Sequence, residues 1–563
     1  MAASKTQTAV IAVTAPTAPT AHLDTFVRDH LPPRGDWPEL RFDLAVLRYP
    51  EHLNCAVELL DRMVAEGHGE RVALRTPEAE CTYRQLLVRA NGIARVLRDE
   101  LGLSPGNRVL LRGYNHPMLV ACWLAVLKAG GIVVTSMPLL RARELRQMTD
   151  KARIGFALCD ARLLEELELA RQGMPEPMRV LHFNAGGAGS LEALIEAAPA
   201  SEASEAFANV ATRADDVALI GFTSGTTGAP KASVHFHRDV LTVCDCFPRA
   251  ILNPAVDDIF CGTSPLAFTY GLGGLLCFPL RYGASSLLLE RPTPESLLQA
   301  IQAQKATICF SVPTFWRQMA GMARDFDLAS LRLCISAGEP LPDSTRQLWR
   351  KATGKEIIDG LGTTELLHIF VSHAAGKARR GAIGQAVPGY QVCVLDAEGR
   401  PLPAGQPGRL AVKGPTGCRY LGDERQRDYV DRGWNLTGDT CLMDADGYVY
   451  YRARNDDIIV TAGYNIAGPE VEEALLQHPA VLECGVVGVP DAERGQIVKA
   501  FVVLRPGLDA ACGGATALVA ELQDFVKQRI APYKYPRAIE FVTSLPRTET
   551  SKLQRFRLRG EKA

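Results

Sequence analysis

Ten residues with the sequence FTSGTTGAPK, from Phe222 to Lys231, carry the strongest chemical signal in this chain. They follow an apolar run at 217–220 and combine hydroxyl groups, glycines and a lysine. Glycines let backbone N–H groups approach an anion, hydroxyls donate hydrogen bonds to it, and a lysine adds positive charge. The segment therefore predicts a loop that closes around a polyphosphate, although a surface turn could share its composition. The groups concerned are Thr223, Ser224, Gly225, Thr226, Thr227, Gly228 and Lys231.

The phosphate loop of kinases and GTPases is the obvious alternative, and it requires G-x-x-x-x-G-K-[ST]. Here Gly228 is followed by Ala229 and Pro230, and Lys231 is followed by Ala232. The lysine and the magnesium-binding hydroxyl of a P-loop therefore have no counterpart at the required positions. The segment is a phosphate-binding loop of a different kind.

A second cluster, DGLGTTE at 359–365, contains two glycines that would let backbone approach a ligand. Thr364 offers a hydroxyl, and the Glu365 carboxylate is a hard oxygen ligand that suits Mg²⁺. The alternative is a polar strand-to-helix turn, in which Glu365 stabilises the first turn of a helix through its dipole.

Two further clusters could hold a ribose and form a hinge. In WNLTGDT, at 434–440, Asp439 could accept hydrogen bonds from both ribose hydroxyls, but aspartate is also common in plain turns. Between 454 and 472, Arg454 lies beside two adjacent acids, Asp456 and Asp457, and this cluster suits a hinge between domains. The segment Gly463–Asn465 suits a tight loop beside a ligand. A charged surface linker would look similar.

The last cluster is LPRTETSKLQR at 545–555, which contains Lys552. A lysine in a terminal loop is usually solvated, so this residue gains meaning only together with the other clusters.

Length and composition limit the classes of protein to consider. The 563 residues are too many for one core, so two or more domains are expected. Net charge is −1, from 62 basic and 63 acidic residues, which offers no general attraction for nucleic acid or an anionic membrane. The longest apolar run, 118–127, is well short of the roughly 20 residues of a membrane span.

Short apolar runs alternate with helical stretches, as in layered α/β proteins. Predicted strands include 108–112, 131–135, 307–311 and 333–336, and 117–129 is predicted as a helix. After a hairpin turn at 444–447, an α+β pattern follows, with helices at 469–477 and 517–529 and strands at 483–489 and 500–504. This predicts a disordered tail at 1–22, a large α/β domain of stacked sheets at 23–453, and a small mobile α+β domain at 454–563.

The chain has 15 cysteines and no C-x-x-C motif. A disulfide framework or structural zinc site is therefore not expected, and a reducing cytoplasm is the predicted location. The first 22 residues are rich in Ala, Thr and Pro but lack the apolar stretch of a secretory signal.

Together, in this order, these clusters resemble the adenylate-forming superfamily of acyl-CoA synthetases, carrier-protein adenylation domains and luciferases. The resemblance covers residues 45 to 557. Within it, SAGEPLP at 336–342, DGLGTTELLHIF at 359–370, AFTYGLGG at 267–274 and YNIAGPEVE at 464–472 resemble aryl-CoA ligases of the benzoate and 2-aminobenzoate type. LPPRGDWPEL at 31–40 favours the 2-aminobenzoate–CoA ligases.

The resemblance implies a role for each cluster. Lys552 would bring positive charge to the reacting carboxylate and α-phosphate, and Glu365 would hold Mg²⁺. Rotation of the small domain about Asp456 would then admit the thiol of coenzyme A. The remaining ATP and CoA contacts would be made by Thr223 to Gly228 and Lys231 on the β- and γ-phosphates, Thr364 on the α-phosphate, Asp439 and Arg454 on the ribose, Gly338, Glu339, Asp359 and Gly360 around the adenine, and Gly463, Tyr464 and Asn465 along the thiol channel.

The predicted acyl pocket contains two aromatic rings that could flank a flat substrate, and one histidine on a predicted helix, TTELLHIF. A core histidine is the alternative for the latter. The pocket residues are Phe236, Thr269, Tyr270, Gly271, Ala337, Leu361 and His368. The chain departs from the superfamily pattern at Leu361, where many members have an aromatic residue, at Phe268, where many have histidine, and at Ser551, where glycine is usual.

The resulting hypothesis is an ATP- and Mg²⁺-dependent aryl-CoA ligase acting on 2-aminobenzoate or benzoate. The alternatives are an adenylating enzyme that loads a carrier protein and a nucleotide-binding regulator without turnover. Assembly as a homodimer is left open, and neither a nucleic-acid partner nor a membrane span is expected.

Overall fold

The computed structural model describes residues 19–187, 189–197, 206–223, 230–454, 457–461, 464–491, 494–507, 515–547 and 553–560. Several predicted site residues lie outside these ranges: Ser224, Gly225, Thr226, Thr227, Gly228, Asp456, Gly463 and Lys552. Residues 1–18 of the predicted tail lie outside them as well.

The largest sheet has nine strands, in the order β15-β14-β13-β12-β11-β9-β10-β1-β2. Strands β9 to β13 and β1 pair in parallel, while the edge strands β2, β14 and β15 are antiparallel. Their bounds are β1 Val72–Arg75, β2 Glu80–Thr82, β9 Ile259–Gly262, β10 Ser285–Leu287, β11 Ile308–Ser311, β12 Leu333–Ala337, β13 Ile357–Gly362, β14 Ile369–Ser372 and β15 Gln385–Ala386.

A second sheet of six strands has the order β6-β5-β3-β4-β7-β8. It is parallel except for the antiparallel pair β7–β8, which flanks the predicted phosphate loop. Its bounds are β3 Arg108–Arg112, β4 Ile132–Ser136, β5 Phe156–Asp160, β6 Arg179–Phe183, β7 Val217–Thr223 and β8 Lys231–Phe236.

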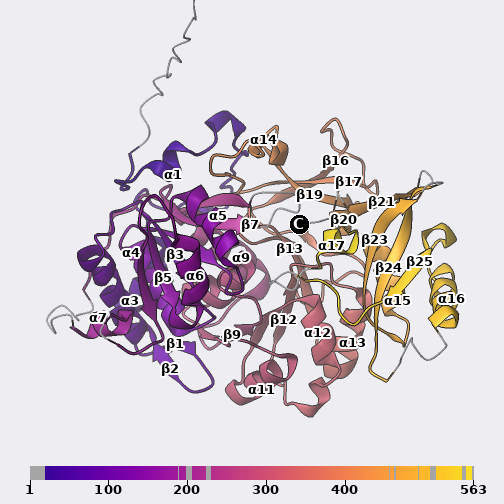
Figure 1. Ribbon diagram of the computed structural model, residues 1–563, viewed down its shortest axis with the longest axis horizontal. Coiled ribbons are helices and arrows are strands. Elements are labelled where there is room, and N and C mark those ends of the chain that lie inside the picture. The colour runs from indigo at the N-terminus through magenta and orange to yellow at the C-terminus, as the bar shows by residue number, and fades with distance from the viewer. Residues whose placement is uncertain are drawn as a thin grey trace, which may run out of the picture.

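Helices cover both sheets, as βαβ connections require. Figure 1 shows this part of the molecule in colours from indigo through magenta to salmon pink. The helices of this region with at least seven residues are α3 Tyr83–Arg95, α4 Pro117–Lys128, α5 Ala142–Ala152, α6 Leu164–Arg171, α7 Leu191–Ala197, α8 His237–Phe247, α11 Pro294–Gln304, α12 Pro313–Ala320 and α13 Asp343–Thr353.

A third sheet completes the large domain. It contains β16 Gln391–Leu395, β17 Gly408–Lys413, β18 Val430–Asp431, β19 Trp434–Met443 and β20 Val449–Arg454, with the short helix α14 Gln426–Tyr429 beside it. Arg454, the first residue of the predicted small domain, is the last residue of β20, and the exact domain boundary stays a prediction.

The small domain lies at the orange-to-yellow end of Figure 1. A two-stranded sheet (β21 Ile458–Thr461 and β22 Tyr464–Ala467) precedes a three-stranded sheet (β23 Val481–Asp491, β24 Gly495–Leu504 and β25 Ala538–Phe541). The helices are α15 Gly468–Leu476, α16 Ala515–Lys527 and α17 Arg555–Leu558.

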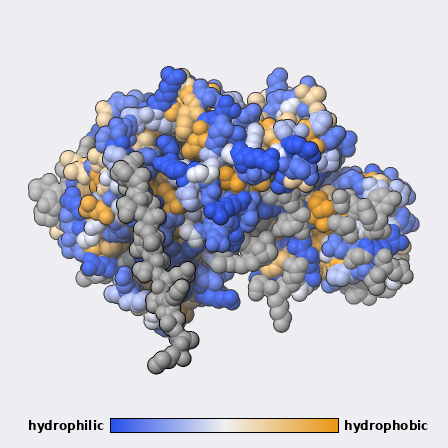
Figure 2. Space-filling model, turned by 90° about the horizontal axis from the view of Figure 1, so that it is seen from above, coloured by the Kyte–Doolittle hydropathy of each residue, from blue (hydrophilic) through white to orange (hydrophobic). Residues whose placement is uncertain are grey.

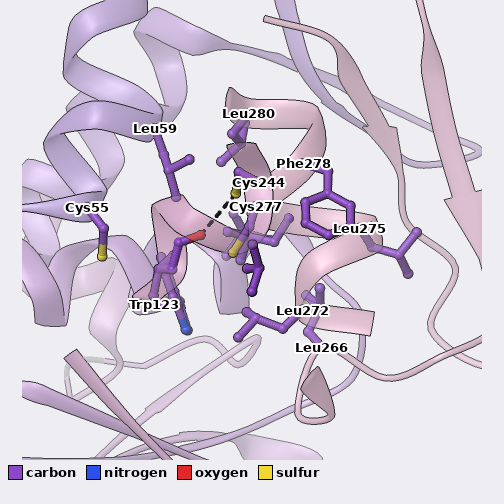
Figure 3. Close-up of a cluster of buried hydrophobic side chains, with 14 of the residues drawn as sticks. Cys55, Leu59, Trp123, Cys244, Leu266, Leu272, Leu275, Cys277, Phe278 and Leu280 are labelled. Atoms are coloured by element: carbon purple, nitrogen blue, oxygen red, sulfur yellow. Dashed lines mark hydrogen bonds between the residues drawn. The ribbon is translucent and has the colours of Figure 1, made fainter. Parts of the chain in front are cut away.

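The main hydrophobic core joins segments that are far apart in the sequence. Trp123 of α4, Cys244 of α8 and Phe278 of the short helix α10 (Phe278–Arg281) point into one cluster (Figure 3). The same core includes Tyr270, Ala337 and Leu366, so it extends beneath the predicted acyl pocket. The fourteen described cysteines are free thiols.

The surface is mixed. On the face shown in Figure 2, hydrophilic residues surround smaller hydrophobic groups. The large apolar side chains that are most exposed, Leu23, Leu139 and Val256, come from separate parts of the chain. Within the described residues, no helix is both long enough and apolar enough to cross a bilayer.

Most predicted elements are confirmed, with bounds that differ by a few residues. Two predictions are wrong. The segment TTELLHIF is a turn followed by β14, because Ile369 to Ser372 pair with β13 and Leu367 has a φ of 69° that no helix contains. The predicted disordered tail extends too far, because Ala21 donates a hydrogen bond to the Asp216 carboxylate and His22 is buried.

Candidate active site

The turn between β13 and β14 is the centre of the candidate site. It follows the carboxyl end of a parallel strand, where ligands bind in open α/β sheets. Its central residue, Glu365, is only 7% exposed, and Thr364 is similarly buried. A Cβ atom at Gly221 of β7 would lie 2.9 Å from Cγ2 of Thr364, so the glycine lets this turn approach the strand that leads into the phosphate loop.

The Glu365 carboxylate is held by two tyrosines. The Tyr420 hydroxyl donates a hydrogen bond of 2.5 Å to Oε1, and the Tyr429 hydroxyl lies 3.4 Å from Oε2. Burial and the nearby Glu365 carboxylate raise the pKa of Tyr420 far above its usual range, so its hydroxyl keeps its proton and acts as the donor.

Lys231, at the end of the predicted phosphate loop, lies over the ring of Tyr420, whose hydroxyl holds this carboxylate. Its Nζ is 5.1 Å from the centre of the Tyr420 ring. The contact follows from the backbone, because residues 419–421 run beside β8: Val234 N donates to Arg419 O, and Leu421 N donates to Ala232 O. Through Tyr420, the structure therefore brings Lys231 and the acidic turn together.

Alternation along β8 moves one predicted pocket residue away from the site. Phe236 packs with Ala232 and Val234 in a separate core, against Trp37 and Arg419. The other face of β8 carries Lys231, Ser233 and His235. The structure therefore does not bring Phe236 to Tyr270 and His368, and its neighbour His235 faces the site, since successive strand residues point to opposite faces.

His235 is fully buried, and within the described residues neither of its ring nitrogens has a hydrogen-bond partner of normal geometry. Burial lowers its pKa to about 4, although Asp239 and the backbone of Thr364 act in the opposite direction. The ring is therefore neutral near pH 7.

The predicted ribose pair is assembled by strand register. Asp439 of β19 stands directly opposite Arg454 of β20, and Asp439 Oδ1 lies 3.6 Å from Arg454 Nη1. Gly438 has a φ of 77°, and a Cβ atom there would lie 2.9 Å from Arg454 Nη2. The arginine thus lies against the glycine turn that presents the buried aspartate.

The predicted adenine residues lie at neighbouring strand ends, because Ala337 of β12 pairs with Gly360 of β13. Gly338, with a φ of 90°, and Glu339 follow β12 directly. Asp359 faces Arg346, whose Nη2 lies 3.0 Å from Oδ2. Burial raises the pKa of Asp359 to about 7 even though Arg346 lowers it.

Of the predicted acyl-pocket residues, Tyr270 and His368 lie together. The Tyr270 hydroxyl donates to the carbonyl oxygens of Ser311 and Ile335, and the His368 ring lies 4.6 Å from that of Phe278. Burial lowers the pKa of His368 to about 3. Both side chains are therefore part of the aromatic core that supports the pocket.

The other pocket residues lie around this core. Thr269 begins the short helix α9 (Thr269–Leu272), and Gly271 in that helix packs directly on backbone, since a Cβ atom would lie 2.2 Å from Pro265 O. Leu361 of β13 is half-buried against the core, and Ala337 is buried.

The small domain reaches this site through Arg547. Its guanidinium lies 3.0 Å from Glu339 Oε1 in the large domain and 3.1 Å from Glu483 Oε2 in its own domain. Arg317 of α12 adds a second contact, with hydrogen bonds to the carbonyl oxygens of Leu476 and Leu482. Tyr464 and Asn465 of the predicted thiol channel lie in β22, paired with Thr461 and Val460.

The donor set fits a nucleotide-bound Mg²⁺. Within the described residues, no three His, Cys, Asp or Glu side chains gather into a metal cage. Proteins usually hold Mg²⁺ through one or two carboxylates and the substrate phosphates, and the buried Glu365 would supply such a carboxylate.

Several residues of the site were not predicted: Tyr420, Tyr429, His235, Arg547 and Arg346. The alternation of β8 could have favoured His235 over Phe236. The other four become recognisable only when distant segments come together.

The described residues thus form a large and a small domain that meet beside a buried acidic turn. The sequence matches the model of the AMP-binding enzyme family over residues 62–420 and that of the AMP-binding enzyme C-terminal domain over residues 470–552. The chain belongs to this family, in the branch of the aryl-CoA ligases, and is an AMP-forming acid–thiol ligase.

Individual relatives support this assignment. The chain is 35% identical to the benzoate–CoA ligase of Thauera aromatica over 91% of its own length and 97% of the relative. A solved anthranilate CoA ligase in complex with anthranoyl-AMP has a TM-score of 0.86 at 32% identity, with 92% of this chain and 98% of that one covered. A benzoate CoA ligase from Burkholderia xenovorans LB400 has a TM-score of 0.80 at 32% identity, with 90% and 99% covered.

Proposed function

We propose that this chain is a two-step aryl-CoA ligase whose substrate is benzoate or 2-aminobenzoate. In the first step, the aryl carboxylate attacks the α-phosphate of ATP and pyrophosphate leaves, which gives an aryl-adenylate. In the second, the thiol of coenzyme A attacks the carbonyl carbon and AMP leaves, which gives the aryl-CoA thioester.

The observation that carries this proposal is the buried Glu365 carboxylate, held by Tyr420, whose ring lies under Lys231 Nζ. Two anions must meet in the first step, so positive charge has to be concentrated around the phosphates. Bound Mg²⁺ supplies part of that charge. Glu365 would hold the metal, Lys231 would bind the outer phosphates, and Thr364 would donate to the α-phosphate.

The remaining roles are proposed from similarity to the family. Asp439 would accept hydrogen bonds from the ribose hydroxyls, with Arg454 fixing its carboxylate. Gly338 and Gly360 would let backbone approach the adenine. Lys552 would approach the reacting carboxylate from the small domain, and rotation about Asp456 would later replace it with the loop at 463–465.

The choice between the two acids rests on similarity alone. The pocket residues Thr269, Ala337 and Leu361 offer apolar and hydroxyl contacts to a flat ring, and none of these groups selects an ortho-amino substituent over hydrogen. The cytoplasmic location and a homodimeric assembly stay predictions.

A substrate panel tests the proposal. Benzoate, ring-aminated and ring-hydroxylated benzoates and aliphatic acids are each incubated with ATP, Mg²⁺ and CoA, and AMP and the thioester are measured. We expect aryl-CoA from benzoate or 2-aminobenzoate. Aryl hydroxamate formation without any CoA thioester would instead support loading of a carrier protein. The absence of ATP–pyrophosphate exchange with every aryl acid would support a regulator without turnover.

A further inference from the structure

The Tyr420 hydroxyl has one partner of normal hydrogen-bond length among the described residues, and this partner is the predicted metal ligand. The side chain is fully buried, and its hydroxyl lies 2.5 Å from Glu365 Oε1. A charge-assisted hydrogen bond of this length to a carboxylate is among the stronger ones in proteins. It fixes the direction of Oε1 and limits the rotation of the carboxyl group.

The Tyr420 side chain is itself held from several sides. Its backbone N donates 2.9 Å to Gln426 Oε1, and it forms an isolated bridge with Ser233 of β8. Its ring packs edge-on against that of Tyr429, with 5.8 Å between centres, in a small core that includes Cys418. These contacts fix the position of the Tyr420 hydroxyl before any ligand binds.

Tyr429 supports the other carboxylate oxygen. Its hydroxyl lies 3.4 Å from Glu365 Oε2 and 3.1 Å from Thr363 Oγ1. This contact is longer, so the Tyr420 contact contributes more to the orientation of Glu365.

The Tyr420 ring also has Lys231 Nζ over its face, 5.1 Å from its centre. A cation in this position is attracted by the ring, by about 0.5–1 kcal/mol at exposed sites and more when desolvated. One side chain thus lies between the cation of the phosphate loop and the carboxylate of the acidic turn.

We propose that Tyr420 is a positioning residue, which orients the Glu365 carboxylate so that its remaining lone pairs face the Mg²⁺ of the nucleotide. The proposal deepens the proposed function and rests on it. Groups that orient a metal ligand typically change metal affinity or activity by 10- to 100-fold when they are removed.

The test compares Tyr420→Phe with Tyr390→Phe. Tyr390 is a matched control, because it is buried and its hydroxyl lies 2.8 Å from Thr416 Oγ1, which donates to Leu366 O of the same turn. Its hydroxyl thus supports the turn without contacting Glu365. The first readout is the affinity for Mn²⁺ in the presence of a non-hydrolysable ATP analogue, measured by electron paramagnetic resonance.

We expect Tyr420→Phe to weaken Mn²⁺ binding by about 10- to 100-fold and Tyr390→Phe by less than about threefold. In kinetics, Tyr420→Phe should raise the Mg²⁺ concentration needed for ATP–pyrophosphate exchange. It should leave the conversion of a supplied aryl-adenylate and CoA to thioester within about twofold of wild type. Equal Mn²⁺ affinities in the two variants, or equal losses in both half-reactions, would overturn the proposal.

If Tyr420→Phe does not fold, Tyr420→Met, which also removes the hydroxyl, is measured in the same way. Weaker Mn²⁺ binding than in Tyr390→Phe supports the proposal, and unchanged binding overturns it. The proposed function and the proposed role of Tyr420 can be contradicted separately. A wild-type protein without exchange activity on any aryl acid contradicts the proposed function, whereas normal exchange with unchanged Mn²⁺ affinity in the variants contradicts only the role of Tyr420.

Discussion

At the residue scale, burial affects the carboxylates of this site in different ways. Burial raises the pKa of Asp359 to about 7, and Arg346 offsets only part of that effect. Burial acts in the same direction on Asp239, but Arg419 and other cations outweigh it and hold its pKa below the usual range. Neighbouring charges therefore decide which buried acid is ionised at neutral pH.

The raised pKa of Asp359 predicts a pH-dependent stability. Because the folded protein holds this proton more tightly than the unfolded chain, the contribution is full below about pH 4 and is lost as pH rises to about 7. The slope is up to about 1.4 kcal/mol per pH unit. We expect the stability of wild type relative to Asp359→Asn to fall across this range, measured by denaturant unfolding. A difference independent of pH would contradict this.

The proposed role of Lys552 predicts that its loss affects the two half-reactions differently. Lys552→Ala should slow ATP–pyrophosphate exchange by at least about 10²- to 10³-fold, because charge at the forming bond is lost. Conversion of a supplied aryl-adenylate and CoA to thioester should stay near the wild-type rate.

The matched control is Lys527→Ala, which removes a lysine of α16 that pairs with Asp524. It should leave both half-reactions unchanged. Equal loss of both half-reactions in Lys552→Ala would exclude the two-conformation scheme.

At the scale of elements, strand pairing decides which side chains face the candidate site. The alternation of β8 directs Lys231 and His235 to the site and Phe236 to a separate core. The register of β19 with β20 places Asp439 opposite Arg454. A shift of one residue in either strand would exchange these faces.

Two glycines around β19 and β20 test this arrangement. Gly438 and Gly447 have φ values of 77° and 82°, but only at Gly438 would a Cβ atom meet a neighbour, Arg454 Nη2 at 2.9 Å. Either change to alanine should cost about 1–2 kcal/mol of stability through the positive φ. Only Gly438→Ala should also weaken ATP binding, by about tenfold, as measured by calorimetry.

Gly447→Ala is therefore the control for backbone strain. Similar ATP affinities in the two variants would show that Arg454 tolerates the added methyl group and that its position is not set by Gly438.

At the scale of the whole molecule, the two domains meet at charged contacts. Arg547 pairs with Glu339 of the large domain and with Glu483 of the small one. It is five positions before Lys552 in the sequence. Such contacts can be broken and remade more readily than an apolar interface, which suits domains that are proposed to rotate.

Arg547→Gln should therefore slow adenylate formation by about tenfold, because it removes the charge pair that anchors the approach of the small domain. Thioester formation from supplied adenylate should change less. The control is Arg537→Gln, which removes an arginine that is hydrogen-bonded to Tyr535 within the small domain. An equal effect on both half-reactions would indicate a general loss of stability.

Local patterns were sufficient for much of the fold. The apolar run at 108–112 and the helix after Pro117 formed as predicted, since propensity and burial agree there. The segment 363–370 did not, because its pairing with β13 depends on a partner strand that local propensity does not describe. The predicted tail ended too late, because Asp216 provides a distant anchor for Ala21.

The sequence by itself determined the chemical class, because the phosphate loop, Glu365, Asp439, Arg454 and Lys552 belong to short segments whose composition carries their chemistry. Only the tertiary structure decided how these groups are held. Tyr420 meets Glu365 across 55 positions of sequence, and Arg547 meets Glu339 across 208. Such contacts arise from strand register and domain packing, which join segments with no common local pattern.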